Sequence, residues 1–363
     1  MSARRHVAYY ISAHGYGHGV RSCDVIRALN ELRPDVSVVM VTDLPAAFLK
    51  NRLPSPLNVI RPGAFDVGLV QLDSIRVDLD ATLQRAEALY ARREELIRGE
   101  MAFLGERGIS MVVADIPAIP LEAASRFGVP GMAIGNFAWD WVYEDFVERD
   151  RRWGPIVQHM REGYGTADLL LRLPFCEPMS AFRRVEDIPL LASPGRNRRD
   201  DLVRLTGCSA AKKWVLLSFT TLEMSDAALA NIEQLSDFEF FTVRPLEWRR
   251  RNIHAVDRDT IPFSDVLASV DVVVSKPGFG LISECVVNGK PLIYADRADF
   301  REYPVLVRAV RRYLKSVFLP AEQLYRGELG PVLEALDRRP APQDTIPAGG
   351  AVIAAQRIAR FLR

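Results

Sequence analysis

The first half of the chain alternates short apolar runs with longer stretches whose apolar residues recur at helical spacing. Short apolar runs bounded by glycine or polar residues are typical of buried strands, and the longer periodic stretches are typical of amphipathic helices. The pattern predicts strands at residues 6–12, 37–42, 111–114 and 131–134, and helices at residues 19–32, 45–52, 119–127 and within 78–107. Strands that alternate with helices in this way build a parallel sheet with helices on both faces.

The second half restarts the same alternation after a proline-rich segment, residues 174–211, which we interpret as a linker or crossover loop. The pattern predicts strands at 214–219, 239–243, 270–275 and 291–295, and helices at 226–235, 263–268, 281–288 and 303–313. The expected fold class is therefore α/β, with Rossmann-like domains at residues 1–185 and 186–347. A last amphipathic stretch, residues 348–363, either caps the second domain or crosses back to the first.

Composition changes this picture little, but it excludes several classes of protein. The chain has 363 residues, enough for two domains, and its 48% hydrophobic and 26% charged residues are typical of a globular protein. Its 47 basic and 46 acidic residues give a net charge of +1, which argues against a dedicated nucleic-acid binder. The four cysteines form no CxxC pair, so neither a disulfide framework nor a zinc site is expected. Without a recognisable signal peptide or membrane-spanning run, we expect a cytoplasmic protein, and a peripheral membrane contact stays open.

A glycine-bearing turn directly follows the first predicted strand and opens the first helix. From residue 12 it reads Ser-Ala-His14-Gly15-Tyr-Gly17-His18-Gly-Val-Arg21. A doubly wound sheet binds ligands at such a turn, because glycine allows close backbone approach and a helix N-terminus attracts anions. Histidine titrates near neutrality, so His18 is a candidate acid or base. For His14, a structural role with the ring packed on the turn's own backbone is equally consistent.

Several common motifs are absent. Gly15, Gly17 and Gly19 do not have the G-x-G-x-x-G spacing of nicotinamide-binding enzymes. The chain also lacks a G-x-x-x-x-G-K-[ST] phosphate loop and a G-x-S-x-G elbow. These absences argue against a P-loop kinase and against a serine hydrolase.

The turn between the predicted strand 270–275 and the helix 281–288 carries a more specific pattern. It reads Ser275-Lys276-Pro277-Gly278-Phe-Gly280-Leu-Ile-Ser283-Glu284. A diphosphate fits the N–H groups at the start of such a helix, assisted by Ser275 and Lys276. The Glu284 carboxylate, near the helix start, can accept hydrogen bonds from both hydroxyls of a ribose. Its alternative role is to complement the helix dipole.

These motifs resemble the GT-B class of glycosyltransferases. The stretch from Ser275 to Asp296 is similar to the donor-binding region of the family that includes the lipid II-forming N-acetylglucosaminyltransferase. Residues 10–21 and 136–143 are similar to the N-terminal glycosyltransferase-like region of bacterial and plant L-arabinokinases. The resemblance covers nearly the whole chain and implies two Rossmann-like domains whose parallel sheets face each other across a cleft. It does not include the sugar-kinase domain of arabinokinases, so kinase activity is not expected.

The resemblance implies that the second domain binds a nucleotide-diphosphate sugar, with UDP as the expected nucleotide. Glu284 would hold the ribose, and the backbone of Ile261 and Phe263 would line the base pocket. Thr220 and Thr221 stand where many relatives carry glycines, so a phosphate contact is either replaced by their hydroxyls or lost. The Asp-Gln pair with which many relatives hold the donor sugar is absent. The donor-side residues that the resemblance implies are Ser218, Thr220, Thr221, Arg244, Ile261, Phe263, Ser275, Lys276, Pro277, Gly278, Gly280, Ser283, Glu284, Asp299, Arg301 and Glu302.

Glycosyl transfer needs a base for the acceptor hydroxyl and stabilisation of the departing diphosphate. The resemblance implies that neither a metal ion nor a further cofactor takes part. His18 is the first candidate for the base and Asp115 the second, with orientation of a histidine as the alternative role of Asp115. The aromatic residues within 137–143 are candidates for an acceptor platform, although aromatic residues at this density more often belong to the core. The acceptor-side residues expected are His14, Gly15, Gly17, Arg21, Asn136 and Trp139.

Two alternatives to sugar transfer remain at this stage. One is a sugar-nucleotide epimerase of the same architecture, which would act on UDP-N-acetylglucosamine without an acceptor. The other is a catalytically inert nucleotide-sugar-binding module, which the altered threonine loop and the absent Asp-Gln pair favour. The donor sugar, the acceptor (small molecule, glycan or lipid-linked) and the stereochemical outcome stay open, since fold alone does not determine them.

Overall fold

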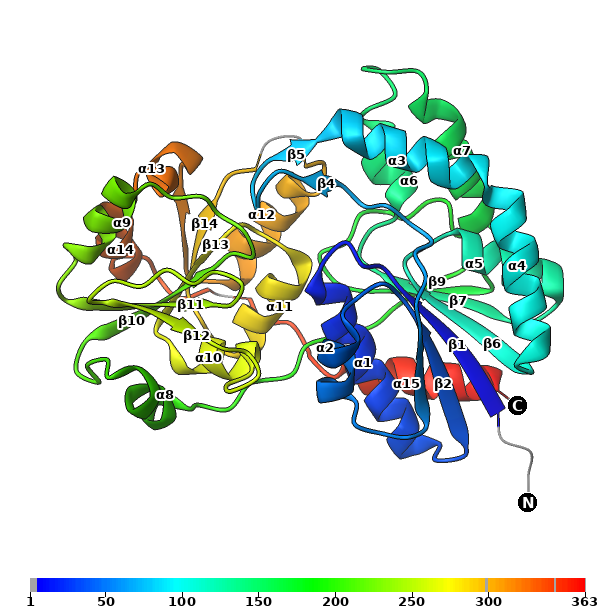
Figure 1. Ribbon diagram of the computed structural model, residues 1–363, viewed down its shortest axis with the longest axis horizontal. Coiled ribbons are helices and arrows are strands. Elements are labelled where there is room, and N and C mark those ends of the chain that lie inside the picture. Colours follow the sequence, from blue (N-terminus) through cyan, green and yellow to red (C-terminus); the bar gives the residue numbers. More distant parts are fainter. Residues whose placement is uncertain (1–4, 298–299, 343, 363) are drawn as a thin grey trace. The chain divides into compact units, whose positions relative to one another are not determined.

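The computed structural model describes residues 5–297, 300–342 and 344–362, and the chain divides into two compact units (Figure 1). Among the described residues, the first unit comprises 5–70, 78–192 and 347–362. The second comprises 71–77 and 193–346, apart from the residues not described. Both units are α/β, as the sequence predicts.

The first unit is built on a sheet with the strand order β3-β2-β1-β6-β7-β8-β9. The strands are β1 (Arg5–Ile11), β2 (Val36–Val41), β3 (Asn58–Arg61), β6 (Ile109–Asp115), β7 (Gly131–Gly135), β8 (Leu169–Arg172) and β9 (Val185–Asp187). The helices are α1 (Tyr16–Leu32), α2 (Ala46–Arg52), α3 (Leu79–Ala91), α4 (Arg93–Glu106), α5 (Ile119–Phe127), α6 (Trp139–Glu144), α7 (Trp153–Tyr164) and α15 (Gly350–Phe361). Neighbouring strands pair in parallel, and Ile11 at the end of β1 lies opposite Asp115 at the end of β6. The carboxyl ends of the central strands therefore share one edge, where such sheets bind ligands.

The second unit repeats this plan with the order β12-β11-β10-β13-β14-β15. The strands are β10 (Lys213–Ser218), β11 (Phe238–Val243), β12 (Ile253–Val256), β13 (Val272–Ser275), β14 (Leu292–Ala295) and β15 (Ser316–Leu319). The helices are α8 (Arg199–Thr206), α9 (Asp226–Glu233), α10 (Phe263–Ser269), α11 (Phe279–Val287), α12 (Tyr303–Tyr313), α13 (Ala321–Tyr325) and α14 (Gly330–Asp337). Its pairings are parallel too, and Ser218 and Tyr294 both lie opposite Ser275. The ends of β10, β13 and β14 are thus level with one another.

Two segments lie in a different unit from the one that the sequence predicts. Residues 71–77 leave the first unit through β4 (Val70–Gln71) and return through β5 (Val77–Asp78), and between them Ile75 joins the apolar core of the second unit. Residues 186–192 belong to the first unit, because β9 adds an edge strand to its sheet. The segment predicted as a linker, 174–211, therefore contains β9 and α8 as well as loops.

The C-terminal helix α15 belongs to the first unit, and it lies beside α1 in Figure 1. Its residues Ala354, Ala355 and Ile358 are buried in the core formed by β1, β2 and α1. A backbone bridge between Leu190 and Ala348 fixes the approach to the helix. Of the two placements that the sequence leaves open for residues 348–363, the structure has the one in which the chain returns to the first unit.

The docking of α15 allows almost no room at Gly350, where a Cβ would lie 2.2 Å from the carbonyl oxygen of Pro189. We expect Gly350→Ala to lower the free energy of unfolding by about 1–3 kcal/mol, the usual cost of overpacking against atoms that cannot move aside. Gly99→Ala is the matched control, because nothing lies within 4 Å of a Cβ there and alanine favours a helix. Urea unfolding of the three proteins checks this, and equal midpoints for Gly350→Ala and the parent would contradict it.

Candidate functional site

Three of the predicted site residues meet at the carboxyl ends of β1 and β6. Helix α1 begins at Tyr16, within the glycine-bearing stretch and earlier than the predicted residue 19, so His18 and Arg21 lie one turn apart on it. Asp115 is the last residue of β6. His18 Nδ1 lies 2.8 Å from Asp115 Oδ1. Arg21 donates its Nε–H to Asp115 Oδ2 at 2.7 Å and an Nη2–H to Oδ1 at 2.5 Å. A histidine, an arginine and a carboxylate thus form one buried network.

Asp115 is fully buried, yet its surroundings favour the ionised carboxylate. Burial alone would raise its pKa, but the charges of Arg21 and His18 and the hydrogen bonds from both outweigh burial and hold the pKa of Asp115 well below its usual range. Ser22 also donates its hydroxyl to this carboxylate, at 3.1 Å. A carboxylate held so strongly in the ionised form is a poor proton acceptor. The role of Asp115 as a base does not fit this environment, whereas its alternative role, orienting a histidine, does.

Arg21 and Asn136 support the network from within the protein. Arg21 donates an Nη1–H to Asn136 Oδ1 at 2.5 Å, and Asn136 donates its Nδ2–H to the carbonyl of Pro174 at 2.5 Å. The guanidinium of Arg21 is therefore engaged at all three nitrogens, and the amide of Asn136 at both of its ends. The sequence predicts an acceptor contact for these two residues, but their polar atoms are occupied by protein partners.

Three of the four aromatic residues within 137–143 belong to the core, and the fourth, Trp141, is half-buried. Phe137, Trp139 and Tyr143 are buried. Trp139 donates its Nε1–H to Asp66 at 2.9 Å, and the hydroxyl of Tyr143 donates to the carbonyl of Gly68 at 2.6 Å. Trp139 is thus the wrong residue for an exposed acceptor platform, and the alternative interpretation, core packing, describes this group.

His14 is held in place by contacts within the protein. Its Nδ1 accepts a hydrogen bond from the backbone N–H of Leu69 at 3.2 Å, and its ring meets Trp139 edge to face. Gly68 has a φ of +68°, and a Cβ there would lie 2.3 Å from His14 Nδ1, so only glycine fits. Beside this contact lies Asp66, whose pKa is raised by burial and is lowered in part by its hydrogen bond from Trp139. No motif marks Asp66 in the sequence.

The glycines of the first turn leave space beside it. A Cβ at Gly15 or at Gly17 would meet nothing within 4 Å, and the φ of −173° at Gly15 is open to any residue. Packing within the protein therefore does not require glycine at either position.

In the second unit, the predicted phosphate-binding turn lies at the ends of β10, β13 and β14. Helix α11 begins after Gly278, which has extended backbone and no side-chain cap, so the first N–H groups of the helix lack a capping side chain. The hydroxyl of Ser275 donates to the carbonyl of Ser218 at 2.5 Å. Ser283 donates to the carbonyl of Phe279 at 2.8 Å, within the helix. The hydroxyls of Ser275 and Ser283 are therefore engaged, contrary to the ligand contacts expected for them.

The remaining residues expected on the donor side differ in their burial and in their position relative to α11. Glu284 is half-buried and lies in the second turn of α11, slightly later than the sequence predicts. Pro277 is buried, and Gly280 belongs to the first turn of that helix. Arg301 is half-buried, and Asp299 lies outside the described residues.

The residues expected at the base pocket are held largely by the protein. Arg244 forms ion pairs with Glu247 at 2.9 Å and Asp257 at 2.7 Å. Ile261 is buried, and its N–H donates to the carbonyl of Asp257 at 3.0 Å. Phe263 is the first residue of α10. This part of the unit is ordered by its own contacts, and Arg244 is committed to its acidic neighbours.

Two buried basic side chains lie at the ends of β13 and β14. Burial, together with the nearby charge of Arg297, lowers the pKa of Lys276 to about 7. Burial also lowers the pKa of Arg297 to about 10, although Glu302 and Asp73 act in the opposite direction. The sequence predicts Lys276 and Glu302 for the site but not Arg297, because a single arginine after a strand carries no motif.

The threonine loop after β10 has an unexpected partner in residues 71–77. Ser74 Oγ accepts hydrogen bonds from the backbone N–H groups of Thr220 at 3.2 Å and Thr221 at 3.1 Å. The N–H of Ser74 donates to the carbonyl of Thr221 at 2.9 Å, and the hydroxyl of Tyr325 donates to Asp73 at 2.8 Å. A serine from elsewhere in the sequence thus occupies the N–H groups of this loop.

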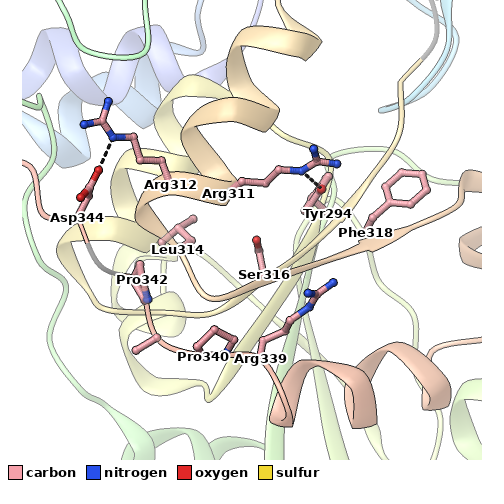
Figure 2. A pocket seen from close by; sticks show the side chains of 11 residues that line it. Tyr294, Arg311, Arg312, Leu314, Ser316, Phe318, Arg339, Pro340, Pro342 and Asp344 are labelled. Atoms are coloured by element: carbon pink, nitrogen blue, oxygen red, sulfur yellow. Dashed lines mark hydrogen bonds and ion pairs between the residues drawn. The ribbon is translucent and has the colours of Figure 1, made fainter.

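A cavity of about 650 Å³ opens elsewhere in the second unit, toward the amino end of β15 (Figure 2). Its lining includes Leu314 and Ser316, and none of the predicted site residues. Two of its arginines are engaged, Arg311 with the Tyr294 hydroxyl at 3.2 Å and Arg312 with a nearby aspartate. Since parallel sheets bind ligands at their carboxyl ends, we do not assign the chemistry to this cavity.

The described residues contain neither a membrane-spanning helix nor a cluster of metal ligands. No helix among them is long and apolar enough to cross a membrane. These residues also contain no group of three or more histidine, cysteine, aspartate or glutamate side chains that could hold a metal ion.

The chain resembles known proteins in sequence and in fold. No family model matches it. It is 28% identical over 356 residues to an L-arabinokinase of Arabidopsis thaliana, covering 94% of this chain and 33% of that protein, so the chain spans about a third of its relative.

Solved glycosyltransferase structures share its architecture. The glycotransferase of kitacinnamycin has a TM-score of 0.65 at 16% identity, and 99% of each chain is covered. A UDP-glucosyltransferase from Polygonum tinctorium that glucosylates indoxyl has a TM-score of 0.64 at 15% identity, covering 100% of this chain and 99% of that one. UDP-glucose:anthocyanidin 3-O-glucosyltransferase, solved with UDP, has a TM-score of 0.62 at 15% identity, with 100% and 99% covered. The fold is therefore GT-B, with two Rossmann-like domains, as the sequence resemblance predicts.

Proposed function

We propose that the protein is a glycosyltransferase that moves a sugar from a nucleotide diphosphate to a hydroxyl of an acceptor. The observation that carries this proposal is the buried His18–Asp115–Arg21 network beside an open glycine turn. The GT-B fold, and the UDP bound in one of the similar structures, support a nucleotide sugar as donor. A cytoplasmic location and a reaction without a metal ion are part of the same proposal.

The network suits His18 to act as a general base. His18 Nδ1 lies 2.8 Å from the ionised carboxylate of Asp115 and 3.0 Å from Arg21 Nη2. In the tautomer with its proton on Nδ1, the imidazole donates a hydrogen bond to Asp115. Nε2 then keeps its lone pair and can take the proton of an acceptor hydroxyl. Arg21 keeps Asp115 ionised and fixes its position, so its contribution to the reaction is indirect.

In this proposal the second unit binds the donor and stabilises the leaving group. In the transfer step the acceptor oxygen forms a bond to the anomeric carbon of the sugar, and the bond from that carbon to the diphosphate breaks. The leaving nucleoside diphosphate carries away the electron pair, and its negative charge is stabilised by the N-terminus of α11 and by Lys276. Glu284 accepts hydrogen bonds from the ribose.

One observation favours the alternative of an inert binding module. The N–H groups of Thr220 and Thr221 are bonded to Ser74 and are withdrawn from any phosphate. Turnover separates the two functions: a panel of acceptors with the matching nucleotide sugar should release nucleoside diphosphate only if the protein is a transferase. A nucleotide sugar consumed without any acceptor would instead indicate the epimerase.

Calorimetry with UDP, GDP, dTDP and ADP tests the donor site directly. We expect one nucleotide to bind, and Glu284→Ala to weaken it by about 10- to 100-fold, because a carboxylate that accepts two hydrogen bonds is lost. Glu334→Ala is the matched control, since it removes an exposed glutamate from the same unit. Failure of all four nucleotides to bind the parent protein would overturn the proposed function.

The pKa of Lys276 predicts how donor binding depends on pH. A lysine with a pKa of about 7 is mostly charged at pH 6 and mostly neutral at pH 8, and only the charged form attracts a diphosphate. We expect affinity for UDP-glucose, whose phosphates do not titrate in this range, to fall by up to about tenfold per pH unit above 7. Lys276→Met should bind more weakly and with a flat pH profile. A parent protein whose affinity is constant from pH 6 to pH 8 would contradict this role.

A further inference from the structure

Arg297 presents two unused hydrogen-bond donors inside the second unit. It follows β14 by two residues, and only 8% of its surface is exposed. Its Nε and Nη2 are shielded from solvent, and neither has a hydrogen-bond partner among residues 5–297, 300–342 and 344–362. The ring of Phe300 lies 3.1 Å from the guanidinium carbon and covers one face of the group. A buried donor without an acceptor costs free energy, so this arrangement calls for a ligand.

The unused pair of donors has the geometry of a carboxylate-binding fork. The Nε and Nη2 edge of a guanidinium offers two parallel N–H groups. In this protein the same edge of Arg21 holds the Asp115 carboxylate, and that of Arg172 holds the Asp187 carboxylate at 2.7 and 3.0 Å. Arg297 therefore matches an anion with two oxygens on one atom.

The charges around Arg297 indicate that this anion comes from outside the protein. Glu302 and Asp73 are close enough to influence the guanidinium, but neither bonds to Nε or Nη2. The charge of Arg297 in turn lowers the pKa of its neighbour Lys276, so the two basic groups disfavour each other's charged form. An anionic ligand would relieve the repulsion between these two basic groups.

The strand order separates this anion from the diphosphate. The diphosphate belongs at the N-terminus of α11, which follows β13, whereas Arg297 follows β14, the next strand outward. With the nucleotide base at the start of α10, a donor extended along the carboxyl edge brings its sugar to β14. We propose that the donor is a nucleotide hexuronate, whose sugar carboxylate is held by the Nε and Nη2 fork of Arg297. This inference rests on the proposed function, and Phe300 must shift for the ligand to enter.

Binding of UDP, UDP-glucose and UDP-glucuronate to the full chain tests this assignment. We expect the parent protein to prefer UDP-glucuronate over UDP-glucose by tenfold or more. At pH 6, where Lys276 is charged in either protein, Arg297→Gln should abolish the preference and leave UDP affinity within twofold. Arg297→Lys, which keeps the charge without the fork, should retain only part of the preference. Arg338→Gln, at an exposed arginine of the same unit, should change nothing. Thermal unfolding of each variant establishes that it is folded before titration.

The outcomes distinguish the inference from the function on which it rests. Equal affinity of the parent for UDP-glucose and UDP-glucuronate would overturn the hexuronate donor while leaving a nucleotide-sugar transferase intact. Equal weakening of all three ligands by Arg297→Gln would assign the fork to the diphosphate and overturn the inference in the same way. Absence of binding by all three ligands, together with failure of GDP, dTDP and ADP to bind, would overturn the proposed function and the inference with it.

Discussion

Replacing His18 by glutamine is expected to slow sugar transfer by about 10²- to 10⁴-fold, the usual contribution of a general base. Glutamine keeps a polar group of similar size near Asp115 but cannot take the acceptor proton. The proposed nucleotide site is built from residues of the second unit, so nucleotide affinity should be unchanged. The measurement is the rate of nucleoside diphosphate release with saturating donor and an acceptor found by screening.

His159→Gln is the matched control for this experiment. His159 lies on α7, where its ring stacks on Tyr90, and it takes no part in the network around Asp115. The control should transfer sugar at close to the parent rate. If His18→Gln is as active as this control, the base is another group, and Asp66, the remaining acidic side chain near His18, becomes the first residue to examine.

Replacing Asp115 by asparagine is expected to lower the free energy of unfolding by about 3–5 kcal/mol. The change removes one partner of a buried ion pair and leaves the charge of Arg21 uncompensated, which is the costly way to break such a pair. Transfer should be lost as well, because His18 no longer has a carboxylate to fix its tautomer. Urea unfolding at pH 7 measures the first effect and the transfer assay the second.

Asp187→Asn provides the comparison. Arg172 donates its Nε–H and an Nη2–H to the carboxylate of Asp187, as Arg21 does to Asp115, but at an exposed position. This substitution should lower the free energy of unfolding by about 1 kcal/mol or less, which is the usual contribution of an exposed ion pair. A similar small cost for Asp115→Asn would contradict the strength assigned to the buried network. Since the pKa of Asp115 is lowered in the folded protein, its stabilising effect is complete at neutral pH and is lost only as the pH falls below about 4.

Tertiary packing explains most differences from the sequence-based expectations at the candidate sites. Trp139 and His14 have the residue types of an acceptor site, but the indole N–H of Trp139 donates to Asp66 and the Nδ1 of His14 accepts from the N–H of Leu69. Ser283 follows a phosphate-binding pattern, yet the helix itself uses its hydroxyl. Residue type and spacing indicate which atoms could bind a ligand, and only packing determines which of those atoms already have a partner.

Long periodic segments were predictable because burial of one face imposes a regular spacing on the sequence. The strands β1, β2, β10 and β11 and the helices α1, α5 and α12 all follow such patterns. The short strands β3, β8, β9, β12 and β15 were not predicted, since three or four residues carry little periodicity. The stretch 78–107 was predicted as helical, but its division into α3 and α4 at Arg92 was not.

The sequence by itself determined the α/β class and the doubled Rossmann-like plan. It also located the glycine-bearing stretch that contains His18 and the turn from which α11 begins. These features depend on local spacing and on the chemistry of glycine, both of which can be read along the chain. Only the tertiary structure decided that α15 returns to the first unit, that Ser74 bonds to the threonine loop, and that Arg297 is buried with unused donors. Such contacts join residues far apart in sequence, and their free energy comes from fitting surfaces together, which no local pattern encodes.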